Sequence, residues 1–353
     1  MTRNSWWRGP VKAEPNFGNL LKVLRREKPD RPTLFEFFMN DPLFRVVTAT
    51  TGPGPGPTET AYDILRFRMQ AFRNLGYDYV TLGVPGFEFP RGRQARQQTL
   101  SQNEGVMITD RKSFDSYAWP DPDKADYAML DTLGRELPAG MKMVVSGPCG
   151  VLENVTFLLG YENLCYLIAD DERLAGNVFA AVGSRLLKYY QRVLQHDGVG
   201  AIIGNDDWGF KSQPMLSPKD MRRLVFPWHK QIVAAAHQAG KPAILHSCGN
   251  LASVFDDIVE DIRYDGKHSY EDTILPVEKA YAQYGKRIAI LGGIDLDFIC
   301  RSSSDEVYTR SRAMLEQSAA GGGYGLGTGN SVPEYVPQEN YFAMIAAAID
   351  ARR

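Results

Sequence analysis

Short apolar segments alternate with longer amphipathic segments along most of this chain. Most of the short segments are followed by Gly, Pro, Asn or Asp, which is typical of buried parallel strands. We predict eight strands, at residues 33–38, 79–82, 141–146, 201–204, 243–245, 264–267, 288–291 and 324–327. The segments between them repeat apolar residues near the helical period. The clearest predicted helices are 61–75, 171–195, 218–239 and 303–318.

Eight strands that alternate with helices predict an α/β fold, specifically a single (β/α)8 barrel. A doubly wound sheet is the alternative. Helix starts support the pattern, because Ser217 is placed as a cap before Pro218, and a Ser, Asp and Glu cluster opens the helix at 303–318. We assign residues 1–20 to an N-terminal extension and residues 21–353 to the barrel domain.

Composition narrows the class of protein. The 353 residues include 40 Lys and Arg against 42 Asp and Glu, and this near balance argues against a nucleic-acid partner. No apolar run approaches the ~18 residues of a membrane helix. The N-terminal segment lacks the apolar centre of a signal peptide. Four cysteines without a Cys-x-x-Cys pair fit a reducing compartment, so we expect a soluble, cytoplasmic protein.

The most informative residues are His246 and Cys248, which follow the predicted strand 243–245. At a spacing of two residues in an extended chain, both side chains point the same way. Parallel α/β folds keep their chemistry at such strand ends. An imidazole beside a thiol predicts half of a zinc site. The alternative is a buried thiol beside a hydrogen-bonded histidine.

In a barrel, the polar residues that follow the strands converge on one face. Besides His246 and Cys248, we expect there Glu36, Asn205, Asp206, Asp207, Trp208, His268, Glu271, Asp295, Thr328 and Asn330. Asp206 and Asp207 are adjacent acids, and crowded carboxylates tend to separate in pKa, which suits acid–base chemistry. The alternative is that one of them caps a helix or pairs with an arginine. Trp208 is expected to line a pocket wall.

A catalytic zinc site needs at least three protein ligands. An oxygen from Glu271, Asp207 or Glu36 could complete the site, and Cys149, which follows the third strand, is a weaker candidate. Otherwise no metal binds, and Cys248 acts as a thiol or only packs.

Other residues of the same types are expected to be structural. Cys165 lies in an apolar helical stretch, which predicts a position in the core. His229 and His237 are eight residues apart on one predicted helix, and we expect them at the surface or the edge of the core. An arginine cluster, Arg91, Arg93 and Arg96, predicts a solvated face or an anion contact.

Several motifs occur in the order seen in the uroporphyrinogen decarboxylase superfamily, which this chain resembles over about residues 20–350. They are Gly204-Asn-Asp-Asp-Trp-Gly209, Ser217-Pro218, His246-Ser-Cys-Gly-Asn250, Gly292-Gly-Ile-Asp295, Gly327-Thr-Gly-Asn-Ser-Val-Pro333 and Pro337-Gln-Glu-Asn-Tyr341. The resemblance implies a (β/α)8 barrel with its site at the C-terminal ends of the strands.

The superfamily holds two chemistries. True uroporphyrinogen decarboxylases hold a tetrapyrrole with an Arg-x-x-x-Arg segment after strand one and an Asp after strand two. Residues 36–41 here read Glu-Phe-Phe-Met-Asn-Asp, and residues 83–88 read Gly-Val-Pro-Gly-Phe-Glu. An acidic, apolar mouth is a poor host for many carboxylates. The chain therefore resembles the corrinoid-dependent methyltransferases more closely.

In that branch a His-x-Cys pair after strand five binds zinc, and it matches His246 and Cys248. The family has a further cysteine after strand eight, and this chain has Thr328 near that position instead. The resemblance implies methyl transfer between a small substrate and a corrinoid that a partner protein carries, with zinc assistance. A homodimer is a further expectation. The alternatives are a tetrapyrrole decarboxylase and a non-catalytic barrel that binds a small ligand.

Within this reading each strand-end residue has an expected role. Asp207, Glu271 and Glu36 are expected to be catalytic. Cofactor contacts are expected from Asn205, Asp206, Trp208, Asp295 and Asn330.

Overall fold

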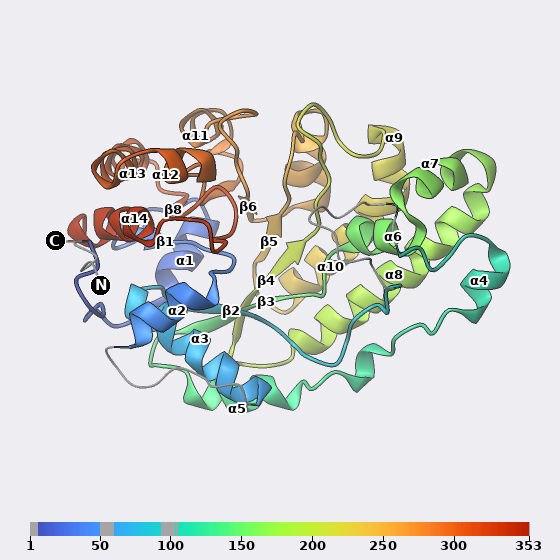
Figure 1. Ribbon diagram of the computed structural model, residues 1–353, viewed down its shortest axis with the longest axis horizontal. Coiled ribbons are helices and arrows are strands. Elements are labelled where there is room, and N and C mark those ends of the chain that lie inside the picture. Colours follow the sequence, from blue (N-terminus) through green and yellow to red (C-terminus); the bar gives the residue numbers. More distant parts are fainter. Residues whose placement is uncertain (1–5, 50–59, 93–102, 104, 353) are drawn as a thin grey trace.

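Eight parallel strands form the centre of the computed structural model, which describes residues 6–49, 60–92, 103 and 105–352 (Figure 1). Their order in the sheet is β1-β8-β7-β6-β5-β4-β3-β2. The strands are β1 (Thr33–Leu34), β2 (Tyr79–Gly83), β3 (Lys142–Ser146), β4 (Val199–Asn205), β5 (Ala243–His246), β6 (Gly266–His268), β7 (Ala289–Leu291) and β8 (Tyr324–Leu326). The predicted (β/α)8 fold is confirmed, and each predicted strand overlaps an observed one.

The boundaries differ from the prediction where backbone pairing ends. The first strand was expected over 33–38, but its ladder with β8 stops at Leu34, and the chain then rises to an isolated bridge between Met39 and Val332. The fifth strand is longer than expected, because His246 still pairs with His268 of β6. His246 is therefore held by the sheet itself.

The seam between β1 and β2 is closed by side chains in the described part of the chain. The backbone N–H of Glu36 donates to the Tyr79 hydroxyl (2.6 Å), and this hydroxyl donates to the Glu36 carbonyl (2.8 Å). The Thr81 hydroxyl donates to the Phe37 carbonyl. These bonds satisfy backbone groups that no neighbouring strand reaches.

Helices surround the sheet (Figure 1). They are α1 (Phe17–Leu24), α2 (Asp41–Thr48), α3 (Ala61–Leu75), α4 (Arg111–Ser116), α5 (Ala128–Glu136), α6 (Val151–Leu159), α7 (Tyr161–Asp170), α8 (Glu172–Val193), α9 (Pro218–Asp220), α10 (Phe226–Gln238), α11 (Val277–Tyr284), α12 (Leu296–Arg301), α13 (Ser304–Ser318) and α14 (Gln338–Asp350). Shorter or wider helical segments are η1 (Pro122–Lys124), η2 (Met221–Val225), η3 (Ala252–Val254) and η4 (Asp257–Ile262).

The four predicted helices are confirmed, and their caps explain the agreement. Thr60 and Ser303 each form a reciprocal capping box at the start of α3 and α13. Ser217 caps α9 as expected, and η2 carries the same helical path into α10. Cys165 departs from the prediction, because α7 presents it to solvent.

The first and the last described segments lie on the same side of the molecule (Figure 1). Trp7 stacks on Phe342 of α14, and Arg8 pairs with Asp350 at 2.7 Å. Helix α1 spans the expected boundary at residue 20. None of the helices in the described ranges combines the length and the apolarity that a bilayer crossing requires.

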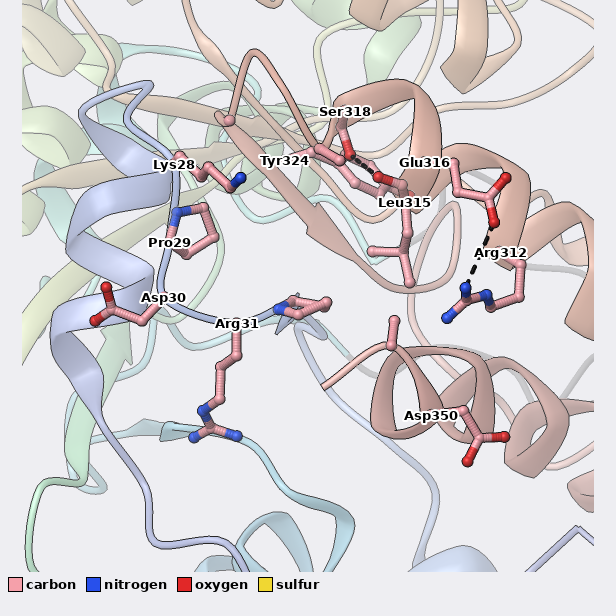
Figure 2. A pocket seen from close by; sticks show the side chains of 14 residues that line it. Lys28, Pro29, Asp30, Arg31, Arg312, Leu315, Glu316, Ser318, Tyr324 and Asp350 are labelled. Carbon is pink, nitrogen blue, oxygen red and sulfur yellow. Dashed lines mark hydrogen bonds and ion pairs between the residues drawn. The ribbon is translucent and has the colours of Figure 1, made fainter. Parts of the chain in front are cut away.

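A cavity of about 480 Å³ lies at the N-terminal ends of β1 and β8 (Figure 2). Several of its charged side chains already have partners, since Arg312 lies 3.4 Å from Glu316 and Lys22 approaches Asp30. This is the end of the barrel opposite to the predicted site. In (β/α)8 barrels the N-terminal end serves stability and the catalytic residues lie at the other end.

Candidate metal centre

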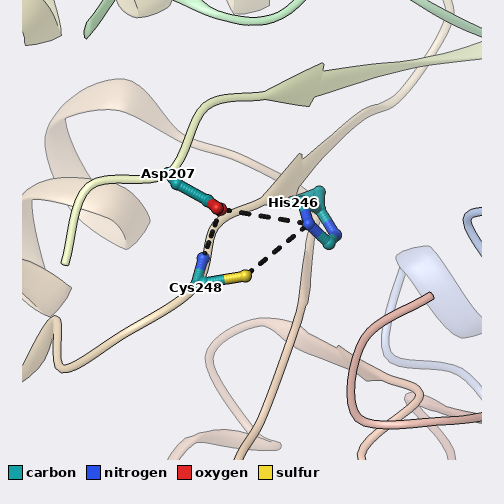
Figure 3. A group of neighbouring side chains, drawn as sticks. All are labelled: Asp207, His246 and Cys248. Atoms are coloured by element: carbon teal, nitrogen blue, oxygen red, sulfur yellow. Dashed lines mark hydrogen bonds and ion pairs between the residues drawn. The ribbon is translucent and has the colours of Figure 1, made fainter. Parts of the chain in front are cut away.

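Three ligand-type side chains meet at the C-terminal ends of β4 and β5 (Figure 3). The Nε2 atom of His246 lies 3.8 Å from Sγ of Cys248 and 4.0 Å from Oδ1 of Asp207. All three ligand atoms lie within 4.8 Å of one another. Of the three oxygen donors that the sequence left open, the structure brings Asp207 to the pair.

Close contact between two loops positions Asp207 against Cys248. The backbone N–H of Cys248 donates to Oδ1 of Asp207 at 2.8 Å. Gly209 and Gly249 bring the loops after β4 and β5 together, and a Cβ on Gly249 would lie 2.1 Å from the Gly209 carbonyl oxygen. Gly249 also has a φ of 86°. Only glycine fits this position, so the loop geometry depends on it.

A chain of hydrogen bonds fixes the tautomer of His246. The Thr328 carbonyl can only accept, so Nε2 of His268 carries the proton at 3.3 Å. Nδ1 of His268 then accepts from Nδ1 of His246 at 2.8 Å. Burial lowers the pKa of His268 to about 3 and the pKa of His246 well below 6.5, so both rings are neutral. Nε2 of His246 therefore presents its lone pair to the cluster.

Glu36 lies at the other end of this series of hydrogen bonds, next to Thr328, and apart from the metal cluster. Its carboxyl group accepts from the Thr328 N–H (3.2 Å) and contacts the Thr328 hydroxyl (2.8 Å). Burial raises the pKa of Glu36 to about 8, so its usual form at neutral pH is protonated. Glu36 is buried, and in this structure its carboxyl group supports Thr328. Its expected catalytic role stays a prediction.

Cys248 has two further polar neighbours. The Ser269 hydroxyl lies 3.4 Å from its sulfur, and Nδ2 of Asn330 lies 3.2 Å away. The Asn330 amide thus joins the cluster from the loop after β8. Thr328, which stands near the position of the family cysteine, is buried and bonds to Glu36 and to the Asn330 carbonyl. Burial, with the charge of Asp207, raises the pKa of Cys248 to about 12.

Asp206 is the centre of a second, fully buried cluster. Its carboxylate accepts from the backbone N–H groups of Leu152 (3.0 Å) and Glu153 (2.8 Å) at the start of α6. It also accepts from the Trp208 indole (2.8 Å) and bonds to Nε2 of His229 (2.9 Å). Neither Asp206 nor Trp208 is exposed. In this structure both residues have a supporting role, and their expected cofactor contacts stay predictions.

His229 was expected at the surface or core edge, and the structure buries it. Its Nδ1 bonds to the Tyr264 hydroxyl at 2.7 Å while Nε2 holds Asp206. The signal for this position was present in the sequence, since His229 shares the buried stripe of α10 with Phe226, Ile232 and Val233. His237 falls off this stripe and pairs with Asp265 at 2.8 Å.

Three other predicted site residues lie outside the metal cluster. Asp295 caps α12 through the Phe298 N–H (3.0 Å) and accepts from the Asp272 N–H (2.8 Å), so both carboxylate oxygens are engaged. Asp295 thus has a capping role, and its expected cofactor contact stays a prediction. Glu271 lines a cavity of about 160 Å³ whose walls include Gly249 and Ser269, on the loops beside the cluster. Asn205 ends β4 opposite His246.

Sequence reasoning missed Lys267, which is buried in the middle of β6. Its ammonium donates to the carbonyls of Ser247 (3.1 Å) and Ser269. Burial lowers its pKa to about 8. The contacts tie together the two loops that carry Cys248 and Ser269. A lysine in a short predicted strand gives no sequence signal for such a role.

The donor set fits zinc. Imidazole nitrogen, thiolate sulfur and carboxylate oxygen are its usual ligands, and three protein ligands leave a position for substrate. Tetrahedral bonds of ~2.0–2.3 Å imply donor separations of roughly 3.3–3.8 Å. The His246–Cys248 separation of 3.8 Å lies at the upper end of this range and the His246–Asp207 separation of 4.0 Å is slightly wider, so small side-chain rotations would bring the donors to one metal ion.

The fold and the cluster define a (β/α)8 barrel protein with a candidate metal centre at the C-terminal ends of its strands. The family model described as uroporphyrinogen decarboxylase (URO-D) matches residues 114–350, about two thirds of the chain. The chain therefore belongs to the uroporphyrinogen decarboxylase family, as the motifs predicted. Among curated proteins, none matches the sequence.

Solved structures support the fold. A methyltransferase from Methanosarcina mazei is similar with a TM-score of 0.74 at 16% identity, covering 96% of this chain and 99% of that one. A xylose isomerase-like TIM barrel protein from Mycobacterium smegmatis has a TM-score of 0.39 at 12% identity, covering 92% and 98%. The first likeness shows a fold shared over 96% of this chain.

Proposed function

We propose that this protein is a methyltransferase that moves a methyl group between a small substrate and a corrinoid carried by a partner protein. The observation that carries the proposal is the Asp207–His246–Cys248 cluster at the mouth of a barrel of this family. The likeness in fold to the Methanosarcina mazei methyltransferase supports the same reading. The corrinoid and its partner come from the resemblance of the motifs alone.

Zinc is the metal that we assign to this cluster, with His246, Cys248 and Asp207 as ligands. When bound, it supplies Lewis acidity to a sulfur or oxygen atom of the substrate. The residues of the chain do the rest. His268 holds the His246 lone pair toward the cluster, and Asn330 orients the Cys248 sulfur.

Decarboxylation of a tetrapyrrole is the second candidate, because the family takes its name from that reaction. The strand ends argue against it. Residues 35–41 and 83–90 carry no arginine, Arg91 is a single cation just beyond them, and Asp207 adds an exposed acid. A substrate with eight carboxylates needs several cations there. Release of coproporphyrinogen from uroporphyrinogen at roughly 1 per second would reverse this preference.

Metal content tests the cluster first. Protein purified without an affinity tag and reconstituted with zinc should hold one equivalent. Cys248→Ala should lose stoichiometric zinc, whereas Cys165→Ala, on the exposed face of α7, should retain it. Absence of zinc from the reconstituted parent protein would contradict the metal assignment.

Methyl transfer is tested separately. Reduced cobalamin, a matched corrinoid protein and candidate methoxylated aromatics or methylamines should give methylcobalamin, which is visible in the corrinoid spectrum. The reverse assay offers methylcobalamin to small thiols. Loss of the signal in Cys248→Ala would support the proposal. No reaction in either direction would favour a barrel that only binds a small ligand.

A further inference from the structure

The cavity of about 480 Å³ at the N-terminal end of the barrel has the size of a small-ligand site, for which ~300–1,000 Å³ is usual (Figure 2). Its walls are the loop between α1 and β1, the C-terminal half of α13 with the turn that follows it, and the end of α14. Gly322 brings the first two walls together, because a Cβ on this residue would lie 2.4 Å from the Glu27 carbonyl oxygen. Its φ of 66° also favours glycine. The fold therefore builds this cavity from a close contact between two segments.

The acidic side chains of the cavity lining are already paired. Asp30 and Asp350 each form an ion pair with a cation outside the lining. Figure 2 shows their carboxylates pointing away from the cavity. Glu316, the third acid, contacts Arg312 at 3.4 Å. A ligand therefore meets no unpaired carboxylate among the described residues that line this cavity.

Two cations of the lining remain available to a ligand. Figure 2 shows Lys28 and Arg312 extending toward the cavity from opposite sides. Within the described ranges, no carboxylate lies at ion-pair distance from Lys28, and the solvent-accessible pair of Arg312 with Glu316 contributes little to stability. Behind the wall, Arg352 donates to the Pro32 carbonyl at 3.1 Å, and burial lowers its pKa only to about 10, so it is charged at neutral pH. These charges favour an anionic group in the cavity.

The arginine cluster that was predicted to form a solvated face or an anion contact offers no comparable site among the described residues. Arg91 is exposed, and its guanidinium group lies 3.7 Å from the centre of the Phe157 ring. Arg93 and Arg96 lie outside the described residues. Unlike Arg91, Lys28 and Arg312 belong to the walls of a cavity.

The rest of the lining is mainly apolar and can bury the body of a small molecule. Its apolar members are Pro29, Pro32, Leu315, Ala319, Tyr324 and Ala351. We propose that this cavity binds a small molecule with an apolar body and a carboxylate group, which pairs with Lys28 while Arg312 adds attraction from the opposite side. The site lies at the end of the barrel away from the metal cluster, so it is independent of the proposed function.

Two matched probes test the carboxylate site by calorimetry at low ionic strength. The full-length protein, with or without zinc, should bind 4-phenylbutanoate about fivefold more tightly than 4-phenylbutanamide, as a partly exposed ion pair allows. Lys28→Gln should remove this preference and leave the amide affinity unchanged, while Arg312→Gln should reduce the preference about twofold. Lys219→Gln and Arg301→Gln are the matched controls, because they remove an exposed lysine after β4 and an exposed arginine that pairs with the residue four positions before it. Both controls should keep the preference.

A cavity-filling variant tests where the apolar body binds. Ala319 belongs to the lining and has a helical φ of −60° and ψ of −35°, so a larger side chain fits the backbone there. Ala319→Phe should weaken the binding of both probes about tenfold, because it takes up the space of the apolar body. Unchanged binding in this variant would place the probes elsewhere and overturn the site.

Three further results would overturn the proposal. They are equal affinity of the parent protein for the two probes, a carboxylate preference that survives in Lys28→Gln, and a preference that depends on zinc, since the carboxylate would then bind at the metal cluster. Because Lys28 is exposed, its substitution should leave the unfolding temperature unchanged, so that a lost preference reports on binding. Failure of methyl transfer in all assays would contradict the proposed function and leave this site standing.

Discussion

Asp206 and Asp207 are neighbours in sequence but occupy opposite environments. Asp206 is fully buried, and its carboxylate meets two backbone amides, an indole and an imidazole. The Asp207 side chain is 42% exposed, and in the structure its carboxylate accepts from the Cys248 N–H. The first carboxylate ties the β4 loop to α6 and α10, while the second faces the open end of the barrel. Of these two adjacent acids, Asp206 therefore supports the structure, and Asp207 is the one placed for chemistry.

This division predicts the largest effect for Asp206→Ala. The substitution leaves four buried donors without an acceptor, and loss of a buried, hydrogen-bonded charge costs on the order of 5 kcal/mol. We expect the free energy of unfolding, measured with urea, to fall by this amount. A loss below about 1 kcal/mol would mean that water or another group replaces the carboxylate.

Glu36 is a third acid to compare, because it is buried like Asp206 but has fewer hydrogen-bond donors around it. Burial raises its pKa from 4.5 to about 8, so the folded state keeps a proton that the unfolded chain releases. The associated stability is complete below pH 4.5 and is lost as the pH rises through 8. Glu36→Gln has the same shape and does not titrate. Between pH 5 and 8, the free energy of unfolding of Glu36→Gln should rise by at most ~4 kcal/mol relative to that of the parent protein.

The check is the urea midpoint of both proteins at pH 5 and pH 8.5. The amide can accept from the Thr328 N–H and donate to its hydroxyl, so the two proteins should be similar at pH 5. A stability difference that is the same at both pH values would show that Glu36 is ionised throughout.

Asp207→Ala should have the opposite result from Asp206→Ala, with a small change in stability and a large loss of zinc affinity. Because its carboxylate is partly exposed, we expect a change in unfolding free energy of less than about 1 kcal/mol. Zinc affinity, measured by competition with a chelator, should fall about 100-fold, which corresponds to ~2.7 kcal/mol. If zinc affinity is unchanged, Asp207 is not a ligand, and the third donor must be sought among Asn330 and Ser269.

The sequence predicted the barrel because its signals are local. Strand ends, caps such as Ser303, and the i, i+2 spacing of His246 and Cys248 all depend on nearby residues. It did not separate Asp206 from Asp207, because that separation depends on α6, which lies some 50 residues earlier. Lys267 likewise gains its role from contacts with the loops after β5 and β6. Local patterns carry no information about such contacts.

The smallest effect is expected for the pair of His246 and His268, which supports the metal cluster. His268 accepts from Nδ1 of His246 and donates to the Thr328 carbonyl. His268→Leu removes both bonds and lets His246 place its proton on Nε2, which competes with metal binding. Zinc affinity should fall about tenfold, or ~1.4 kcal/mol. Glutamine can accept and donate at the same two points, so His268→Gln should retain more of the affinity than His268→Leu. Equal zinc affinity in both variants and the parent protein would show that the tautomer of His246 is set without His268.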